Sequence, residues 1–114
     1  MASVRRGSES GKRDKSGAIK YDDSKPRYDL IPPRPMEALA IHFGRGAAKY
    51  GDRNWEAGMG WGRLFRAAMT HAWLYWRGEE NDKDTGTHHL ICAVWNLLCL
   101  YEYTLTRKGK DDRP

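Results

Sequence analysis

The sequence predicts an all-α protein whose small helical bundle is completed by association between chains. Its 114 residues have room for one domain. Three segments carry apolar residues at the spacing of α-helices, and two of these segments are apolar on almost every side. Such helices must be buried, and three helices cannot bury two of them alone. We therefore expect a homo-oligomer, either a dimer or a tetramer, with a four-helix type of bundle formed between chains.

The segment ahead of the helices is irregular. Residues 17–35 contain four prolines, which exclude a long helix or a central strand. We expect this segment to run along the surface. Its apolar residues, which are candidates for anchoring it to the helices, are Tyr28, Leu30 and Ile31.

Most of the net charge of +5 lies at the N-terminus. Residues 1–20 hold six basic and two acidic side chains, so the remainder of the chain is nearly neutral. The stretch over 1–17, rich in Gly, Ser and Lys, has the composition of a disordered basic tail. Because most of the net positive charge lies at the N-terminus and the folded part, the domain over 18–106, is nearly neutral, we do not expect nucleic acid as a partner.

The first helix begins at Pro35, a favourable residue for a first helical turn, and ends by Gly51, which suits a helix C-terminus. Its apolar residues recur at helical spacing: Met36, Leu39, Ala40, Phe43 and Ala47. A glycine-rich loop over 51–62 follows.

The second and third helices are the apolar ones. They are predicted over about residues 63–77 and 87–106, and an acidic loop over 78–86 connects them. Residues 107–114 are expected to be a disordered C-terminal tail.

Two cysteines lie seven residues apart on the third helix. At 1.5 Å rise per residue, the Cα atoms of Cys92 and Cys99 are about 10.5 Å apart, too far for a disulfide within that helix. Buried free thiols suit a reducing compartment. The chain also lacks a run of about 20 apolar residues and the apolar region of a secretory signal. We therefore expect a cytoplasmic protein with no membrane partner.

Polar residues inside the apolar helices are candidates for a site. His71 lies within the second helix, and His89 and Asn96 share one face of the third helix, two turns apart. A buried polar group without a partner costs about 1–3 kcal/mol, so these residues require an explanation. They are either core residues with satisfied hydrogen bonds or members of a functional site.

The acidic loop offers ligands for a cation. Glu79 and Asp82 stand three residues apart, and carboxylate oxygens are the ligands that Mg²⁺ and Mn²⁺ prefer. The alternative is a solvated acidic turn. We do not expect zinc, because its candidate ligands all lie along the third helix and cannot all face one ion: His88, His89, Cys92 and Cys99.

Basic residues stand beside aromatic residues at two places. These residues suggest contacts to phosphates from the cations and stacking on a base from the rings, although ordinary surface charge is the alternative. The candidates for substrate binding are Lys25, Arg27, Lys49, Tyr50, Arg53 and Trp55.

Several blocks of the sequence, in order, resemble the phage dATP/dGTP diphosphohydrolases, which are related to the MazG nucleotide pyrophosphohydrolases. The blocks span about residues 18–103 and comprise Lys20–Pro33, Gly46–Trp55, Ala67–His71, Trp76–Asp82, Gly86, His89 and Trp95–Asn96. The resemblance implies a MazG-like helical fold, an oligomer, and metal-dependent cleavage of deoxypurine nucleoside triphosphates to monophosphate and pyrophosphate. It also implies a location in the host cytoplasm and, in phages that replace adenine with 2-aminoadenine, a supply of dGMP to the modified-base pathway.

One departure affects the choice of metal ligands. The wider MazG group carries an E-x-x-E motif on one helix and an E-x-x-D motif on the next. Here the first helix offers Glu37 with Ala40, and the third offers His89 with Cys92. Only the pair Glu79 and Asp82 matches an E-x-x-D motif.

The resulting hypothesis is a pyrophosphate-releasing hydrolase of dGTP and dATP. Glu79 and Asp82 would hold Mg²⁺ or Mn²⁺, and the catalytic residues would be His71, Glu79, His89 and Asn96. The alternatives are a small non-enzymatic phage protein that binds nucleic acid through its basic tail and an inactive nucleotide-binding relative.

Overall fold

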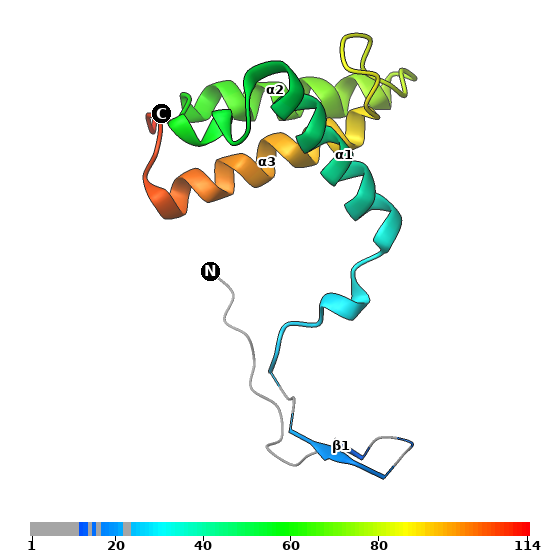
Figure 1. The fold of residues 1–114 in the computed structure, drawn as a ribbon. Coiled ribbons are helices and arrows are strands. Elements are labelled where there is room, and N and C mark those ends of the chain that lie inside the picture. Colours follow the sequence, from blue (N-terminus) through cyan, green and yellow to red (C-terminus); the bar gives the residue numbers. More distant parts are fainter. Residues whose placement is uncertain (1–11, 14, 16, 22–23) are drawn as a thin grey trace. The chain divides into compact units, whose positions relative to one another are not determined.

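The fold class is all-α, as predicted. The computed structural model describes residues 12–13, 15, 17–21 and 24–114. Three helices carry the fold (Figure 1): α1 over Pro33–Tyr50, α2 over Trp61–Trp76 and α3 over His89–Thr106. Two short 3-10 helices precede and follow α1, namely η1 over Tyr28–Leu30 and η2 over Asn54–Ala57. The ends of the three predicted helices lie within two residues of the observed ends.

The chain divides into two compact units, residues 1–31 and 32–114. In the first unit the strand β1, Lys12–Arg13, pairs antiparallel with β2, Ile19–Lys20, an arrangement that the sequence pattern did not predict. The three residues considered as anchors for this segment are all exposed: Tyr28, Leu30 and Ile31. The tail predicted to be disordered over 1–17 lies largely outside the described residues.

The second unit is built around the contact between α2 and α3. These helices lie side by side and run in opposite directions, while α1 crosses α3 (Figure 1). Trp61 and Leu64 of α2 pack against Cys99 and Tyr103 of α3. Residues spaced by three or four share one helix face, so each pair projects into the same core. Burying a large apolar side chain contributes about 1.5–3 kcal/mol.

Both cysteines are free and buried, as predicted. Burial raises the pKa of the Cys99 thiol to about 12, so this residue is an unreactive part of the core. Among the described residues, no helix combines the length and the apolar character that crossing a membrane requires.

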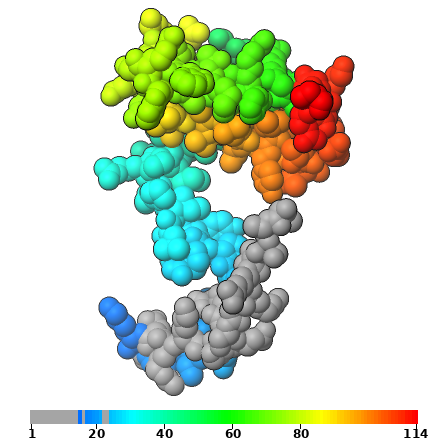
Figure 2. Space-filling view, turned by 180° about the vertical axis from the view of Figure 1, so that it is seen from behind, coloured from blue at the N-terminus to red at the C-terminus, as the bar shows by residue number. Residues whose placement is uncertain are grey.

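The C-terminal segment packs on the start of α2, although the sequence analysis expected no structure there. The Trp61 indole donates a hydrogen bond to the Lys108 carbonyl (2.8 Å), and the Trp61 amide donates one to the Lys110 carbonyl (2.9 Å). The Asp112 carboxylate accepts from the Gly62 amide at 2.7 Å and places a negative charge at the positive end of the helix dipole. Figure 2 shows this segment, in red, against the N-terminal end of α2, in green.

Gly109 provides a test of this packing. Its φ of +73° is in the left-handed region, and a Cβ there would collide with the carbonyl oxygen of Met59. We expect Gly109→Ala to lower the free energy of unfolding by about 2 kcal/mol or more, as measured by chemical denaturation. The control is Gly44→Ala within α1, where a Cβ meets open space and higher helix propensity should raise stability by about 0.5–1 kcal/mol. Equal stabilities of both variants would mean that the segment does not pack in this way.

Candidate functional site

Two histidines from adjoining helices meet at one end of the α2–α3 pair. His71 Nδ1 and His89 Nδ1 are 2.8 Å apart. Asp82, from the loop between the helices, completes a group in which one ligand atom of each residue lies within 4.8 Å of the others. His71 and Asp82 are half-buried, and His89 is fully buried.

The loop between α2 and α3 holds Asp82 in place through its own hydrogen bonds. The Asp82 amide donates to the Thr87 carbonyl at 2.8 Å, and the Gly86 amide donates back to the Asp82 carbonyl at 2.8 Å. The Asp82 Oδ2 atom accepts from the amide and hydroxyl of Thr85, at 3.0 and 2.7 Å. These contacts leave Oδ1 for the cluster.

Glu79 sets the tautomer of the neutral His89 ring. The Glu79 Oε2 atom lies 2.6 Å from His89 Nε2, and this hydrogen bond lowers the pKa of the Glu79 carboxyl. An ionised carboxylate accepts the Nε2 proton, so a neutral His89 ring has no proton on Nδ1. The lone pair of Nδ1 therefore points toward His71. Histidines that bind metals commonly have a carboxylate on their other nitrogen in this way.

The electrostatic environment keeps the cluster ready to bind a cation. Burial lowers the pKa of His71, which favours the neutral ring. Burial acts to raise the pKa of Asp82, but the hydrogen bonds from Thr85 together with the two nearby histidines outweigh it, so the pKa is lowered and the carboxylate stays ionised. One ligand atom of each of His71, Asp82 and His89 lies within 4.8 Å of the others, so these three residues could hold one cation together.

The helix α1 contributes two residues that the sequence analysis missed. Arg45 donates a hydrogen bond to the buried hydroxyl of Thr87 at 2.6 Å, and His42 Nδ1 lies 2.8 Å from the same oxygen. The Thr87 hydroxyl has two lone pairs and one proton, so it accepts from Arg45 and either donates to His42 Nδ1 or accepts from it, according to the tautomer of the His42 ring. Burial, followed by the Arg45 charge, lowers the pKa of His42. The sequence signal was present, since His42 and Arg45 share one face of α1.

A cavity of about 700 Å³, within the usual range for small-molecule sites, is lined by residues of α1, η2, α2 and α3. Aromatic side chains form much of its wall: Phe43, Tyr50, Trp55 and Trp95. Its polar lining includes Arg53, Arg63 and Asn96. Ala67 in the wall precedes His71 of the cluster by one helical turn, about 6 Å along the axis of α2.

The predicted site residues fall into separate groups. His71, Asp82 and His89 form the cluster, and Glu79 contacts it through His89 rather than as a fourth member. Tyr50, Arg53, Trp55 and Asn96 line the cavity instead.

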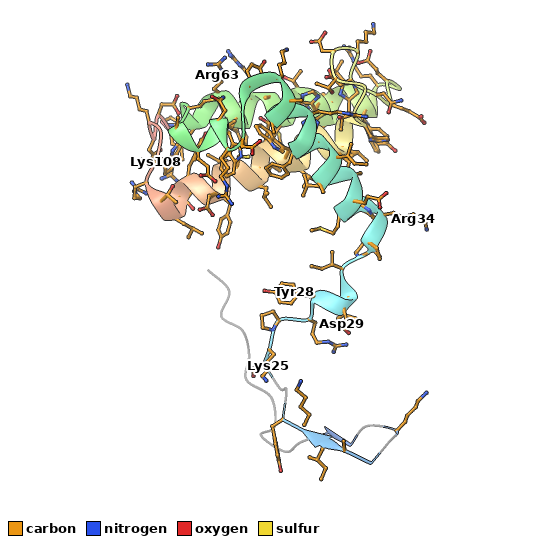
Figure 3. All side chains as sticks on the ribbon, viewed as in Figure 1. Lys25, Tyr28, Asp29, Arg34, Arg63 and Lys108 are labelled. Atoms are coloured by element: carbon orange, nitrogen blue, oxygen red, sulfur yellow. The ribbon has the colours of Figure 1, made fainter. Side chains whose placement is uncertain are left out.

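The remaining predicted substrate-binding residues lie outside both groups. Lys49 is exposed, and its ammonium lies 5.2 Å from the centre of the Tyr50 ring. Lys25 belongs to the first unit and is exposed (Figure 3). Arg27 belongs to the same unit, where its guanidinium makes two hydrogen bonds to Asp29, at 2.9 and 2.8 Å.

Comparison with known proteins identifies the family. A family model described as the N-terminal part of dATP/dGTP diphosphohydrolases matches residues 15–113. The chain belongs to this family. A dATP/dGTP diphosphohydrolase of Salmonella phage PMBT28 is 34% identical to it over 95 residues, which are 83% of this chain and 32% of the relative. This member of the family therefore spans about a third of the length of that relative. No solved structure matches the chain.

Proposed function

We propose that this chain hydrolyses dATP and dGTP between the α and β phosphates, releasing pyrophosphate and leaving the monophosphate. The observation that carries the proposal is the cluster of His71, Asp82 and His89, with Glu79 holding His89 in the tautomer that binds a cation. The name of the phage relative, a dATP/dGTP diphosphohydrolase, supports the substrate class.

The chemistry of the cluster fits a divalent cation. Two imidazole nitrogens and one carboxylate oxygen suit Mn²⁺ or a similar transition-metal ion better than Mg²⁺, which prefers oxygen ligands. When bound, such an ion supplies neutralisation of phosphate charge and a water molecule of lowered pKa.

The residues of the chain have separate proposed roles in binding the cation, positioning its ligands and binding phosphate. Asp82 and the two Nδ1 atoms of His71 and His89 hold the cation, and Glu79 is a positioning residue that keeps the His89 proton on Nε2. Arg45 uses one N–H on Thr87, and its remaining N–H groups are available to phosphate oxygens.

The cavity is the proposed place for the purine base. Its aromatic wall offers faces for stacking. Its wall residue Ala67 is one helical turn from His71, and the phosphates of the bound nucleotide would extend from there toward the cluster. Base, sugar and phosphates would therefore lie along α2.

A panel of nucleotides tests the function. We expect dATP and dGTP, incubated with the chain and Mn²⁺, to yield pyrophosphate and monophosphate on anion-exchange chromatography. The rate should be lower with Mg²⁺ and should fall to background with EDTA. Release of orthophosphate as the first product, or hydrolysis that persists in EDTA, would contradict the proposal.

We also infer that the chain self-associates through α2 and α3. Large apolar residues on both helices are at least 42% exposed: Phe65, Trp73, Trp76, Leu90, Val94, Leu97, Leu98, Tyr101 and Leu105. On α2 they recur at positions 65, 73 and 76, along one side of the helix. Exposed apolar surface of this extent is typical of an interface, and Figure 2 shows the two helices adjoining on one face.

A further inference from the structure

Asn96 is the buried polar residue of the cavity wall, and burying a polar amide costs free energy unless its hydrogen bonds are satisfied. Its side chain is 7% exposed and lies on α3, in the wall that also contains Trp95. The Asn96 Nδ2 atom donates a hydrogen bond to the Cys92 carbonyl one turn earlier, at 2.9 Å. This bond sets the orientation of the amide, because an oxygen facing that carbonyl would be repelled.

The rest of the Asn96 amide is without a hydrogen-bond partner among the described residues. The second N–H of Asn96 and its Oδ1 atom make no hydrogen bond to another described residue. Every fully enclosed polar side-chain atom among the described residues has a hydrogen-bond partner, so Oδ1 is not enclosed. Since Asn96 lines the cavity beside aromatic side chains, this acceptor and this donor are the groups with which a ligand in the cavity could pair.

We propose that Asn96 reads the edge of the purine base, an inference that rests on the proposed function. Adenine presents the N6 amino donor beside a ring-nitrogen acceptor, and guanine presents the N1–H donor beside the O6 acceptor. An amide can pair with either edge, because it also combines a donor with an acceptor. Trp55 and Trp95 supply the apolar surfaces against which the base would lie.

The variant Asn96→Asp predicts a change in specificity with a defined direction. A carboxylate has two acceptors and no donor. Guanine offers it two adjacent donors, N1–H and the N2 amino group, whereas adenine offers only its N6 amino group. A well-placed pair of hydrogen bonds discriminates by about 1–3 kcal/mol, so we expect the preference for the guanine nucleotide over the adenine nucleotide to increase by about tenfold or more.

The experiment measures binding apart from hydrolysis. Dissociation constants for α,β-methylene dGTP and α,β-methylene dATP, which cannot be cleaved at that bond, are determined by calorimetry with Mn²⁺ present. The wild-type chain should bind both analogues, and Asn96→Asp should shift the ratio toward the guanine analogue. The variant Asn96→Ala suits a helix and provides a second measurement in case Asn96→Asp does not fold. It should weaken the binding of both analogues by about tenfold.

The control is Cys99→Ala, a buried substitution one turn further along α3 in the core and outside the cavity wall. It should lower the melting temperature yet leave both dissociation constants unchanged. The proposal is overturned if Asn96→Asp leaves the ratio of the two dissociation constants unchanged, or if Cys99→Ala loses as much affinity as Asn96→Ala, because Asn96 would then have a structural role. It is also overturned if the wild-type chain binds neither analogue. If both analogues bind and the ratio shifts but dATP and dGTP are not hydrolysed, base reading stands and the proposed hydrolysis fails.

Discussion

Replacing His89 with asparagine is expected to lower kcat for dGTP by about a thousandfold and to remove Mn²⁺ binding. His89 is fully buried and contacts both His71 and Glu79. The substitution therefore removes a proposed metal ligand and, with it, the contact to the positioning carboxylate of Glu79. Calorimetry with Mn²⁺ alone and the pyrophosphate assay measure the two effects separately.

Two further variants make this prediction specific. Glu79→Gln, which leaves the proposed ligands in place, should cost only about 10–100-fold in Mn²⁺ affinity or activity. His88→Asn is the matched control, because the His88 side chain caps α3 by accepting from the Leu90 amide and asparagine is also a good helix cap. It should retain activity. Wild-type turnover in His89→Asn would exclude the cluster as the catalytic centre.

The second large effect concerns assembly. Trp73 is 65% exposed on α2, and a buried tryptophan is often a dominant contributor to an interface. We expect Trp73→Glu to raise the dissociation constant of the oligomer by about a hundredfold, since Glu would place a charge in an apolar contact. Size-exclusion chromatography with light scattering should show the wild-type chain as an oligomer and the variant as a monomer.

The control for assembly is Ile41→Glu on α1, which is 49% exposed and lies outside the two helices of the proposed interface. The mass in solution should not change, and circular dichroism should show both variants folded. A wild-type chain that is monomeric at high micromolar concentration would contradict self-association.

Helical periodicity was sufficient to predict the three helices, because the pattern of apolar residues is local. The C-terminal segment was not predictable in the same way. It is held by carbonyl groups of residues 108 and 110 that accept from Trp61, and by Asp112 at Gly62. Backbone groups carry no sequence signature, and the partners are about fifty positions apart.

The sequence predicted only part of the candidate site, because some of its contacts join residues that are far apart in the chain. His89 and Asn96 share one helix face, which suggested a common site, but seven residues advance the helix by about 10.5 Å. One cation cannot be reached from both positions, and Asn96 lines the cavity instead. His42 and Arg45 were overlooked because they meet the site through Thr87, which is more than forty residues away in the chain.

The two buried cysteine thiols also provide a way to measure how often the helical core opens. Cys92 and Cys99 are 1% and 0% exposed, so an alkylating reagent can reach them only when α3 separates from its neighbours. The rate at which iodoacetamide modifies them therefore reports how often that separation occurs. A ligand that tightens the bundle should slow the modification without any label having been introduced.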